Sequence, residues 1–511
     1  MTLQLLALNM TTPKGRRWTL LVTVAAALLL LTLDNSILYT ALPTLTRDLG
    51  ASSLQALWII NAYPLVMAGM LLSTGTLGDR IGHREMFLGG LCVFGLASII
   101  AAFAPTASVL IGARALLAVG AAAMMPSTLA LIFITFRDER ERNLALAIWG
   151  CMAIVGSALG PIVGGLLLNH FWWGSVFLLN VPVVIAALVS ALVVTPRVKP
   201  DTSKPWDLIS AVQALFALSG LVVTIKEVAH APSSWALAGT ALAVTVVAGM
   251  LFVRRQARLT YPLLDFAIFR NSALMAGVLA CASALFGVAG LQLIVTQRFQ
   301  LVAGFSPLEA GLLVSAVALG ALPSVVLGGA FVHRIGLLVL IGGGLALGTV
   351  GVFLTSFGLH VSLGWVIAGL VVTGFGLGSV MSVASSAVVG NAPSSRAGMA
   401  SSVEGVSYEF GALLAVALLG SLLAGLYSSG VVLPAGVSDN ARDSMDQALA
   451  IAAQNGTDSA ALIAAASTAF DRSFEIVIVV IAAVLSISAL VTSVLLRNHG
   501  PGSSAFSSDS H

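Results

Sequence analysis

Fourteen stretches of this chain are long and apolar enough to cross a lipid bilayer. A membrane-spanning helix needs about 20 apolar residues to cover about 30 Å of hydrocarbon. Only 9% of the residues are charged and 58% are hydrophobic, which is far too apolar for a soluble domain. The sequence therefore predicts an all-α polytopic membrane protein. The fourteen predicted spans lie near residues 18–40, 54–76, 87–104, 107–130, 144–168, 174–195, 207–228, 234–253, 272–297, 309–332, 337–357, 362–389, 399–426 and 473–496.

The distribution of basic residues tests this number of spans. Lys and Arg concentrate in the cytoplasmic segments of membrane proteins. With the N-terminus in the cytoplasm and the spans alternating, 18 of the 24 basic residues fall in cytoplasmic segments, and the bias persists to the C-terminus. A missing or extra span would invert the bias beyond it. We therefore predict fourteen spans with both termini in the cytoplasm.

A short repeat indicates how the spans are grouped. The string Gly329-Ala-Phe-Val-His333-Arg334-Ile-Gly336 echoes Gly75-Thr-Leu-Gly-Asp79-Arg80-Ile-Gly82, and both follow a span on the cytoplasmic side. Two six-helix bundles related by an axis along the membrane normal leave such a repeat, although so short a string can also recur by chance. The predicted parts are a cytoplasmic N-terminus (1–17), an N-terminal bundle (18–195), a linker with two extra spans (196–271), a C-terminal bundle (272–496) and a cytoplasmic tail (497–511).

The largest loop outside the membrane covers about residues 428–472. It is polar and acidic, and its stretch 443–468 has helical character. The pattern favours either a small cap or hairpin, or a disordered loop, and the sequence does not separate the two.

Two glycine-rich strings indicate where helices turn tightly or pack closely against one another. In the first, glycines allow a tight turn and close helix approach, and the charges beside them can latch the two bundles together on the cytoplasmic side; the alternative is a plain loop. Its residues are Gly75, Gly78, Asp79, Arg80, Gly82 and Arg84. In the second, small residues four apart let helices pack backbone to backbone along one face, and a proline bends the helix. Its residues are Gly156, Gly160, Pro161, Gly164 and Gly165.

Charged residues inside the predicted spans mark a candidate site, because burying them in lipid is costly. Arg114 lies in the fourth span and needs a partner or water. Asp34 lies in the first span; it could carry protons, or form a static pair, for instance with Arg114. Glu404 and Glu409 lie five residues apart on one helix, so they point about 140° away from each other.

We expect Glu409 to face a bound cation, since a desolvated carboxylate suits a proton carrier. A static pair remains the alternative for both glutamates. The neighbours Glu227 and Lys226, near the end of a linker span, are expected to pair with each other.

Aromatic side chains in the spans could hold a lipophilic cation through cation–π contacts. The candidate pocket residues are Trp58, Asn61, Tyr63, Trp149, Phe286 and Tyr408. The seven histidines lie in loops, tails or span ends without metal-ligand spacing or a partnered nucleophile, and no Walker loop is present. The sequence thus predicts a transporter with no catalytic residues, metal, cofactor or use of ATP, and no nucleic-acid partner.

The first glycine string resembles the loop signature of the major facilitator superfamily, and the second resembles that of its antiporters. The strings Leu57-Trp58-Ile-Ile-Asn61-Ala-Tyr63 and Tyr408-Glu409-Phe-Gly411 extend the likeness. The chain resembles the fourteen-span drug/proton antiporters, near the exporters of methyl viologen and quaternary ammonium compounds. Relatives often carry an acid where Asn61 stands, and its loss could narrow the substrate range.

The resemblance implies two bundles that alternate access across the bacterial inner membrane. It also implies a monomer in lipid that exchanges protons for lipophilic cationic drugs such as quaternary ammonium compounds, methyl viologen, ethidium and acridine dyes. An exporter of a neutral antibiotic, lipid or metabolite on the same fold is the first alternative. A membrane sensor that transports nothing is a remote one.

Overall fold

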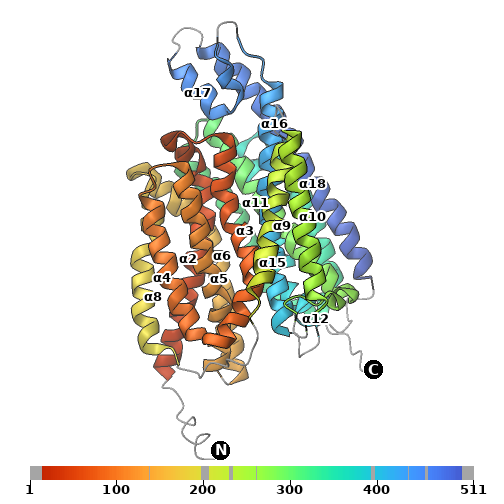
Figure 1. The fold of residues 1–511 in the computed structure, drawn as a ribbon. Coiled ribbons are helices and arrows are strands. Elements are labelled where there is room, and N and C mark those ends of the chain that lie inside the picture. The colour runs from red at the N-terminus through yellow and green to blue at the C-terminus, as the bar shows by residue number, and fades with distance from the viewer. Residues whose placement is uncertain are drawn as a thin grey trace, which may run out of the picture.

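The structure is a computed structural model that describes residues 14–136, 138–196, 206–229, 234–259, 262–392, 397–434, 437–454 and 459–497. Helices are its only regular elements over these residues (Figure 1). The first half of the chain forms one bundle. Its helices are α2 (Lys14–Leu49), α3 (Ser53–Ile81), α4 (His83–Ala102), α5 (Ala107–Thr135), α6 (Glu139–His170), α7 (Ser175–Leu178) and α8 (Asn180–Val194).

The second half forms another bundle beside the first. Its helices are α11 (Ser272–Leu301), α12 (Pro307–Ile335), η2 (Leu338–Gly343), α13 (Gly344–Val361), α14 (Leu363–Val388), α15 (Ala397–Leu414), η4 (Ala415–Gly420), α16 (Ser421–Gly430) and α18 (Ser459–Leu495), with the short η1 (Phe266–Arg270) before them. Fourteen helices over the described residues are long and apolar enough to span a bilayer, which confirms the predicted number. The chain enters the first of them and leaves the last at the same end (Figure 1).

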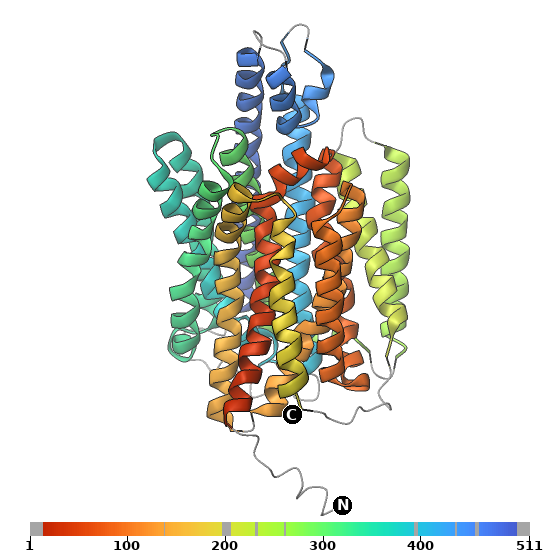
Figure 2. The ribbon, with the colours of Figure 1, turned by 90° about the vertical axis from the view of Figure 1, so that its left-hand side faces the viewer.

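Two further helices, α9 (Leu208–Ala229) and α10 (Trp235–Gln256), lie between the bundles in sequence and stand beside them in space (Figure 2). They pack on each other, and α9 also packs on α3 and α16, where the two bundles meet. Val222 of α9 is fully buried with Leu65 and Leu413, one from each bundle. The linker pair therefore covers one side of the seam between the bundles.

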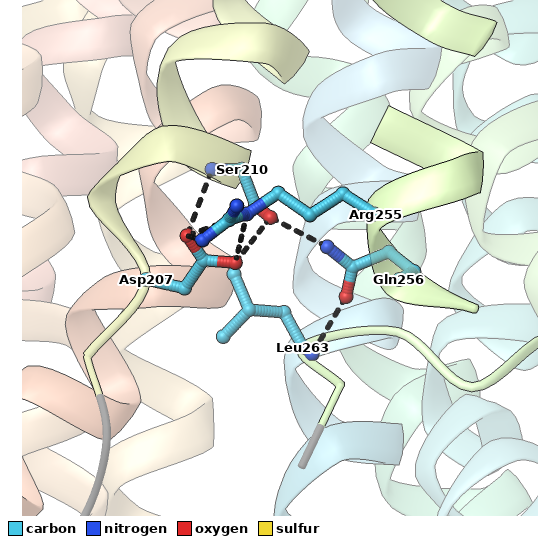
Figure 3. Close-up of polar contacts among 5 residues, drawn as sticks. All are labelled: Asp207, Ser210, Arg255, Gln256 and Leu263. Atoms are coloured by element: carbon cyan, nitrogen blue, oxygen red, sulfur yellow. Dashed lines mark hydrogen bonds and ion pairs between the residues drawn. The ribbon is translucent and has the colours of Figure 1, made fainter. Parts of the chain in front are cut away.

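A polar clamp fixes the two ends of the linker pair (Figure 3). Arg255 of α10 donates to both carboxylate oxygens of Asp207 at 3.0–3.1 Å, and Asp207 also accepts from the Ser210 backbone at the start of α9. Gln256 donates to Ser210 and accepts from the Leu263 amide. Partial burial raises the pKa of Asp207, but the hydrogen bonds from Arg255 and Ser210 outweigh it and hold that pKa below its usual value.

The predicted repeat is visible in the backbone. The second span, α3, ends at Gly82 with φ 105°, and the tenth, α12, ends at Gly336 with φ 83°. Both angles lie in the region that favours glycine. The repeated string therefore marks the same turn in each bundle, at the same end of the molecule.

The loop after α16 forms a small helical cap. It holds η5 (Asp439–Arg442), α17 (Met445–Gln454) and the first turns of α18, above the rest of the bundle (Figure 1). Tyr427 donates to the Ala441 carbonyl at 3.1 Å, and Ser53 of α3 donates to the Asp443 carbonyl at 2.9 Å. The described part of 428–472 is thus an ordered cap that touches both bundles. We call this end of the molecule the cap end and the opposite one, where α2 begins, the basic end.

Candidate functional site

A buried ion pair lies at the centre of the N-terminal bundle. Arg114 of α5 donates to Asp34 of α2 at 2.6 Å, and neither side chain is more than 1% exposed. Asn180 of α8 donates to the other Asp34 oxygen at 2.6 Å and also to Ser98 of α4. Both carboxylate oxygens are therefore satisfied, as a buried charge requires. The static pair of Asp34 with Arg114, left open by the sequence, is what the structure shows.

The guanidinium of Arg114 has further partners. It lies 4.7 Å from the ring centroid of Tyr63 on α3, and it donates to the Ile59 carbonyl and to Asn35 at 3.4 and 3.5 Å. Arginine offers five donors in a fixed plane and stacks on aromatic rings. Arg114 thereby holds α2, α3 and α5 together in the half of the bundle nearer the cap end.

Glu409 of α15 reaches this centre from the other bundle. Its carboxylate interacts electrostatically with Arg114, Tyr39 and Tyr63. In contrast to Asp34, one of its oxygens, Oε2, is buried and has no hydrogen-bond partner among the described residues. The structure therefore brings four predicted site residues together, namely Asp34, Tyr63, Arg114 and Glu409, and leaves one carboxylate incompletely paired.

Glu404 points elsewhere, as its spacing from Glu409 predicts. It accepts hydrogen bonds from Ser385 of α14 at 2.7 and 2.9 Å. Its charge acts on Cys281 of α11 and on Tyr408, which is hydrogen-bonded to Cys281. Glu404 and Tyr408 thus belong to the C-terminal bundle, away from the ion pair.

Lys226 of α9 is a buried cation that the sequence analysis assigned differently. We expected it to pair with Glu227, but its ammonium lies 4.3 Å from the ring centroid of Trp58 and has no hydrogen-bond partner in the part of the chain that the structure describes. It is only 3% exposed. The expected pairing is wrong because Lys226 turns toward α3, where an aromatic face is available. One face of Trp58 is therefore already occupied by a cation of the chain itself.

The other pocket candidates lie in the apolar interior of the molecule. Phe286 is buried in the main apolar core, and Trp149 packs at its edge with its indole N–H unpaired. Asn61 is fully buried, and neither polar atom of its amide has a partner. That these residues form one aromatic pocket with Tyr408 stays a prediction.

The contacts of Arg84, in the first glycine string, lie inside one bundle. It donates to Thr195 and to the Leu192 carbonyl at the end of α8, and to Glu85. Asp79 pairs with His83 at 3.1 Å. In this structure the end of α8 thus supplies acceptors for Arg84, and the expected latch between the bundles stays a prediction. Arg80 is half-buried, while Gly75 approaches Ser402 of the second bundle.

The second glycine string uses two neighbouring faces of α6 and not one. A Cβ at Gly156, Gly160 or Gly164 would collide with or crowd α2 of the same bundle. Gly165 instead faces the backbone of Leu308 on α12, and Pro161 faces Gly311 on α12. Positions 161 and 165 are one turn apart, so they form a second stripe. This stripe joins the two bundles near the cap end.

Sequence reasoning missed Asn180, Tyr39 and the orientation of Lys226. Asn180 is an amide in an otherwise apolar run, and that isolation could have marked it. Among the described residues, no group of three or more His, Cys, Asp or Glu could hold a metal ion. The chemistry at this centre is thus that of carboxylates, a guanidinium and aromatic rings, which can attract a cation and exchange a proton.

Comparisons with known proteins agree with this architecture. Residues 24–416 match the family described as Major Facilitator Superfamily. The chain is 38% identical to the methyl viologen resistance protein SmvA of Salmonella typhimurium over 86% of this chain and 89% of that protein. It is also 38% identical to the multidrug efflux pump LfrA of Mycolicibacterium smegmatis, over 94% and 97% of the two chains.

A more distant relative is the tetracenomycin C resistance and export protein of Streptomyces glaucescens, 34% identical over 80% of this chain and 77% of that protein. The crystal structure of a bacterial homologue of the lysosomal transporter Spinster shares the fold. It is 17% identical with a TM-score of 0.67, covering 96% of this chain and all of that one. The chain therefore belongs to the Major Facilitator Superfamily, as a multidrug exporter of the SmvA and LfrA type.

Proposed function

We propose that this exporter exchanges protons for lipophilic cations and that Glu409 carries the exchanged proton. The observation behind the proposal is the difference between the two central carboxylates. Asp34 has a partner on each oxygen, whereas Glu409 keeps one buried oxygen unpaired. An incompletely paired carboxylate at membrane depth is costly as an anion, so it binds either a proton or a cation.

Asp34 has a different part in this proposal. Its charge is balanced by Arg114, and the pair orients Tyr63 and the neighbouring helices toward Glu409. Tyr39 and Tyr63 then form an aromatic wall beside the exchanging carboxylate, where a lipophilic cation gains cation–π attraction. We propose Trp58 as a wall only after Lys226 moves away.

The direction of transport follows from the driving forces. We place the basic end in the cytoplasm of a bacterial cell and the cap end outside its inner membrane, as the distribution of Lys and Arg predicts. Each charge that moves across 100 mV contributes about 2.3 kcal/mol. Exchange of the one proton on Glu409 for a monovalent drug is driven by the pH gradient, and a second proton in each cycle would add the membrane potential to the driving force.

The proposed substrates are quaternary ammonium compounds, ethidium, acridine dyes and methyl viologen, and no cofactor beyond the proton gradient is required. The relatives named for methyl viologen resistance and multidrug efflux support this class. The relative named for an antibiotic is the reason to test uncharged compounds as well.

Ethidium transport in proteoliposomes tests the proposal. The purified protein would face an imposed pH gradient, and we expect gradient-driven ethidium movement in the wild type and none in Glu409→Gln. Glu475→Gln is a matched control, because Glu475 is 49% exposed on α18 and pairs only with His360. Normal ethidium movement by the Glu409→Gln protein would refute the assignment of Glu409 as the proton carrier. If the protein transported neutral dyes but not cationic ones, its substrates would be the neutral compounds of the alternative function.

A further inference from the structure

Two buried threonines on the seam between the bundles lack the bond that threonines make in helices. The hydroxyls of Thr46, Thr349 and Thr355 each donate to the carbonyl four residues earlier. Thr40 of α2 and Thr296 of α11 are both fully buried, yet neither hydroxyl has a partner among the residues that the structure describes. Buried polar groups without partners are rare and costly, so each needs an explanation.

Two amides share this property. Gln292 of α11 is 3% exposed, and its Nε2 donates to nothing. Asn61 of α3 is fully buried with both of its polar atoms unpartnered. We call Thr40, Asn61, Gln292 and Thr296 the polar strip.

Helical spacing places these residues on the surfaces where the bundles meet. Gln292, Thr296 and Gln300 are four residues apart, so they share one face of α11. Gln300 donates to the Thr40 carbonyl at 3.0 Å, which fixes this face against α2 of the other bundle. Asn61 lies one turn below Leu57, whose side chain meets Gly420 across the seam.

The strip leads from a cavity toward the exchanging carboxylate. A cavity of about 70 Å³ lies under the cap, and its lining includes Thr46, Leu57, Gln297 and the cap residue Asp446. Gln297 follows Thr296 directly, so the outer end of the strip adjoins this cavity. Thr40 also lies at this outer end, because its carbonyl accepts from Gln300, one turn beyond Thr296 toward the cap. At the inner end, Asn61 lies two residues from Tyr63, which interacts electrostatically with Glu409.

We propose that the polar strip is the path by which protons reach Glu409 from the cap end. The inference rests on the proposed function. While the seam is closed the strip is buried, so bulk solvent does not reach it. When the cap-end halves of the bundles part, water fills the strip and its hydroxyls and amides order that water. A hydronium ion then gives its proton to the Glu409 carboxylate, leaving water and a neutral acid, and the cation is released.

The closed seam is well defined in the structure. Backbone contacts between α6 and α12 at Gly165 and Pro161, together with the cap contact at Ser53, hold the cap-end halves together. The unpaired groups of the strip are satisfied only when this seam opens to water. The same groups that guide protons therefore also favour opening.

The test compares substitutions that keep side-chain shape but remove polarity. Thr296→Val and Gln292→Leu would be reconstituted, and ethidium-driven proton movement would be followed with a pH-sensitive dye beside equilibrium ethidium binding. We expect proton-coupled exchange to fall about tenfold or more, with binding changed less than twofold. Thr355→Val is the matched control, since Thr355 is equally buried but bonded within its own helix.

A rescue experiment separates proton access from packing. Thr296→Ser keeps the hydroxyl and loses the methyl group, so we expect it to retain most of the exchange rate. The inference is overturned if Thr296→Val exchanges normally, or if Thr296→Ser is as slow as Thr296→Val. If the wild type itself moves no protons with ethidium, the proposed function fails, and the two failures are thereby distinguished.

Discussion

The two carboxylates at the centre of the molecule are held in opposite ways. Asp34, in the N-terminal bundle, is bonded on both oxygens by Arg114 and Asn180. Glu409, in the C-terminal bundle, interacts electrostatically with the same Arg114, but its Oε2 is unpaired among the described residues. A carboxylate with fixed partners loses little by staying charged, whereas one without them changes state easily. Our proposal follows from this difference: the first carboxylate organises its bundle, and the second exchanges the proton.

The two buried basic side chains repeat the contrast. Arg114 has an ion pair, backbone and amide acceptors and a ring, while Lys226 has only the ring of Trp58. Both are almost fully buried. Burial alone therefore does not show which charged group changes its proton or its partner during transport. The number of its ionic and hydrogen-bond partners is the better guide.

Removing Arg114 should have the largest effect on the stability of the protein. Arg114→Met leaves Asp34 as an uncompensated buried charge, and breaking such a pair costs about 3–5 kcal/mol. We expect a large fall in Tm, measured by tryptophan fluorescence on heating. The double variant Asp34→Asn with Arg114→Met should recover part of the loss, because no lone charge remains. Equal stability of all three proteins would contradict the role given to the pair.

Removing Asn180 gives a smaller effect of the same kind. Asn180→Leu deletes one hydrogen bond to a charged group, which is worth about 1.5–3 kcal/mol. The expected result is a lower Tm with ethidium-driven proton movement still present, because Glu409 is untouched. A variant that keeps its Tm but loses exchange would show that the Asp34 side is the working one.

The cap offers a carboxylate outside the spans. Burial of this cap residue raises the pKa of Asp446 to about 6 from 3.8, although Arg47 opposes the change. A raised pKa means that the docked cap binds the proton more tightly than the undocked one. Docking is therefore strongest below about pH 4 and weakens as the pH rises through 6. Asp446→Asn should strengthen docking at pH 7.5 by about 1–3 kcal/mol and leave it unchanged at pH 4.

Hydrogen exchange of the α17 amides at the two pH values measures this effect. The expected pattern is slower exchange of α17 in Asp446→Asn at pH 7.5 only. The same change at both pH values would show that Asp446 acts through packing.

The smallest effect is expected at Lys226. Lys226→Met removes a cation–π contact worth about 0.5–2 kcal/mol, but it also removes the cost of burying an ammonium. The two terms oppose each other, so the Tm should change far less than in Arg114→Met, its matched comparison. A loss as large as that of Arg114→Met would mean that Lys226 has a partner comparable to an ion pair.

Much of this architecture could be predicted from the sequence, because length, hydropathy and basic residues report on the bilayer directly. The fourteen spans, the repeat at Gly82 and Gly336 and the opposite orientations of Glu404 and Glu409 all follow from local spacing. The partners that side chains find on other helices do not follow from local spacing. Nothing local distinguishes a Lys226 paired with Glu227 from one placed on Trp58, or shows that Arg84 binds the end of α8.

Drug-induced proton release tests the central claim most directly. Ethidium would be mixed with the purified protein in weakly buffered detergent, and the protons released would be counted with a pH indicator for wild type, Glu409→Gln and Asp34→Asn. We predict release from the wild type, none from Glu409→Gln, and release that persists in whatever fraction of Asp34→Asn remains folded. Release that persists in Glu409→Gln and disappears in folded Asp34→Asn would contradict the account and make Asp34 the exchanging carboxylate.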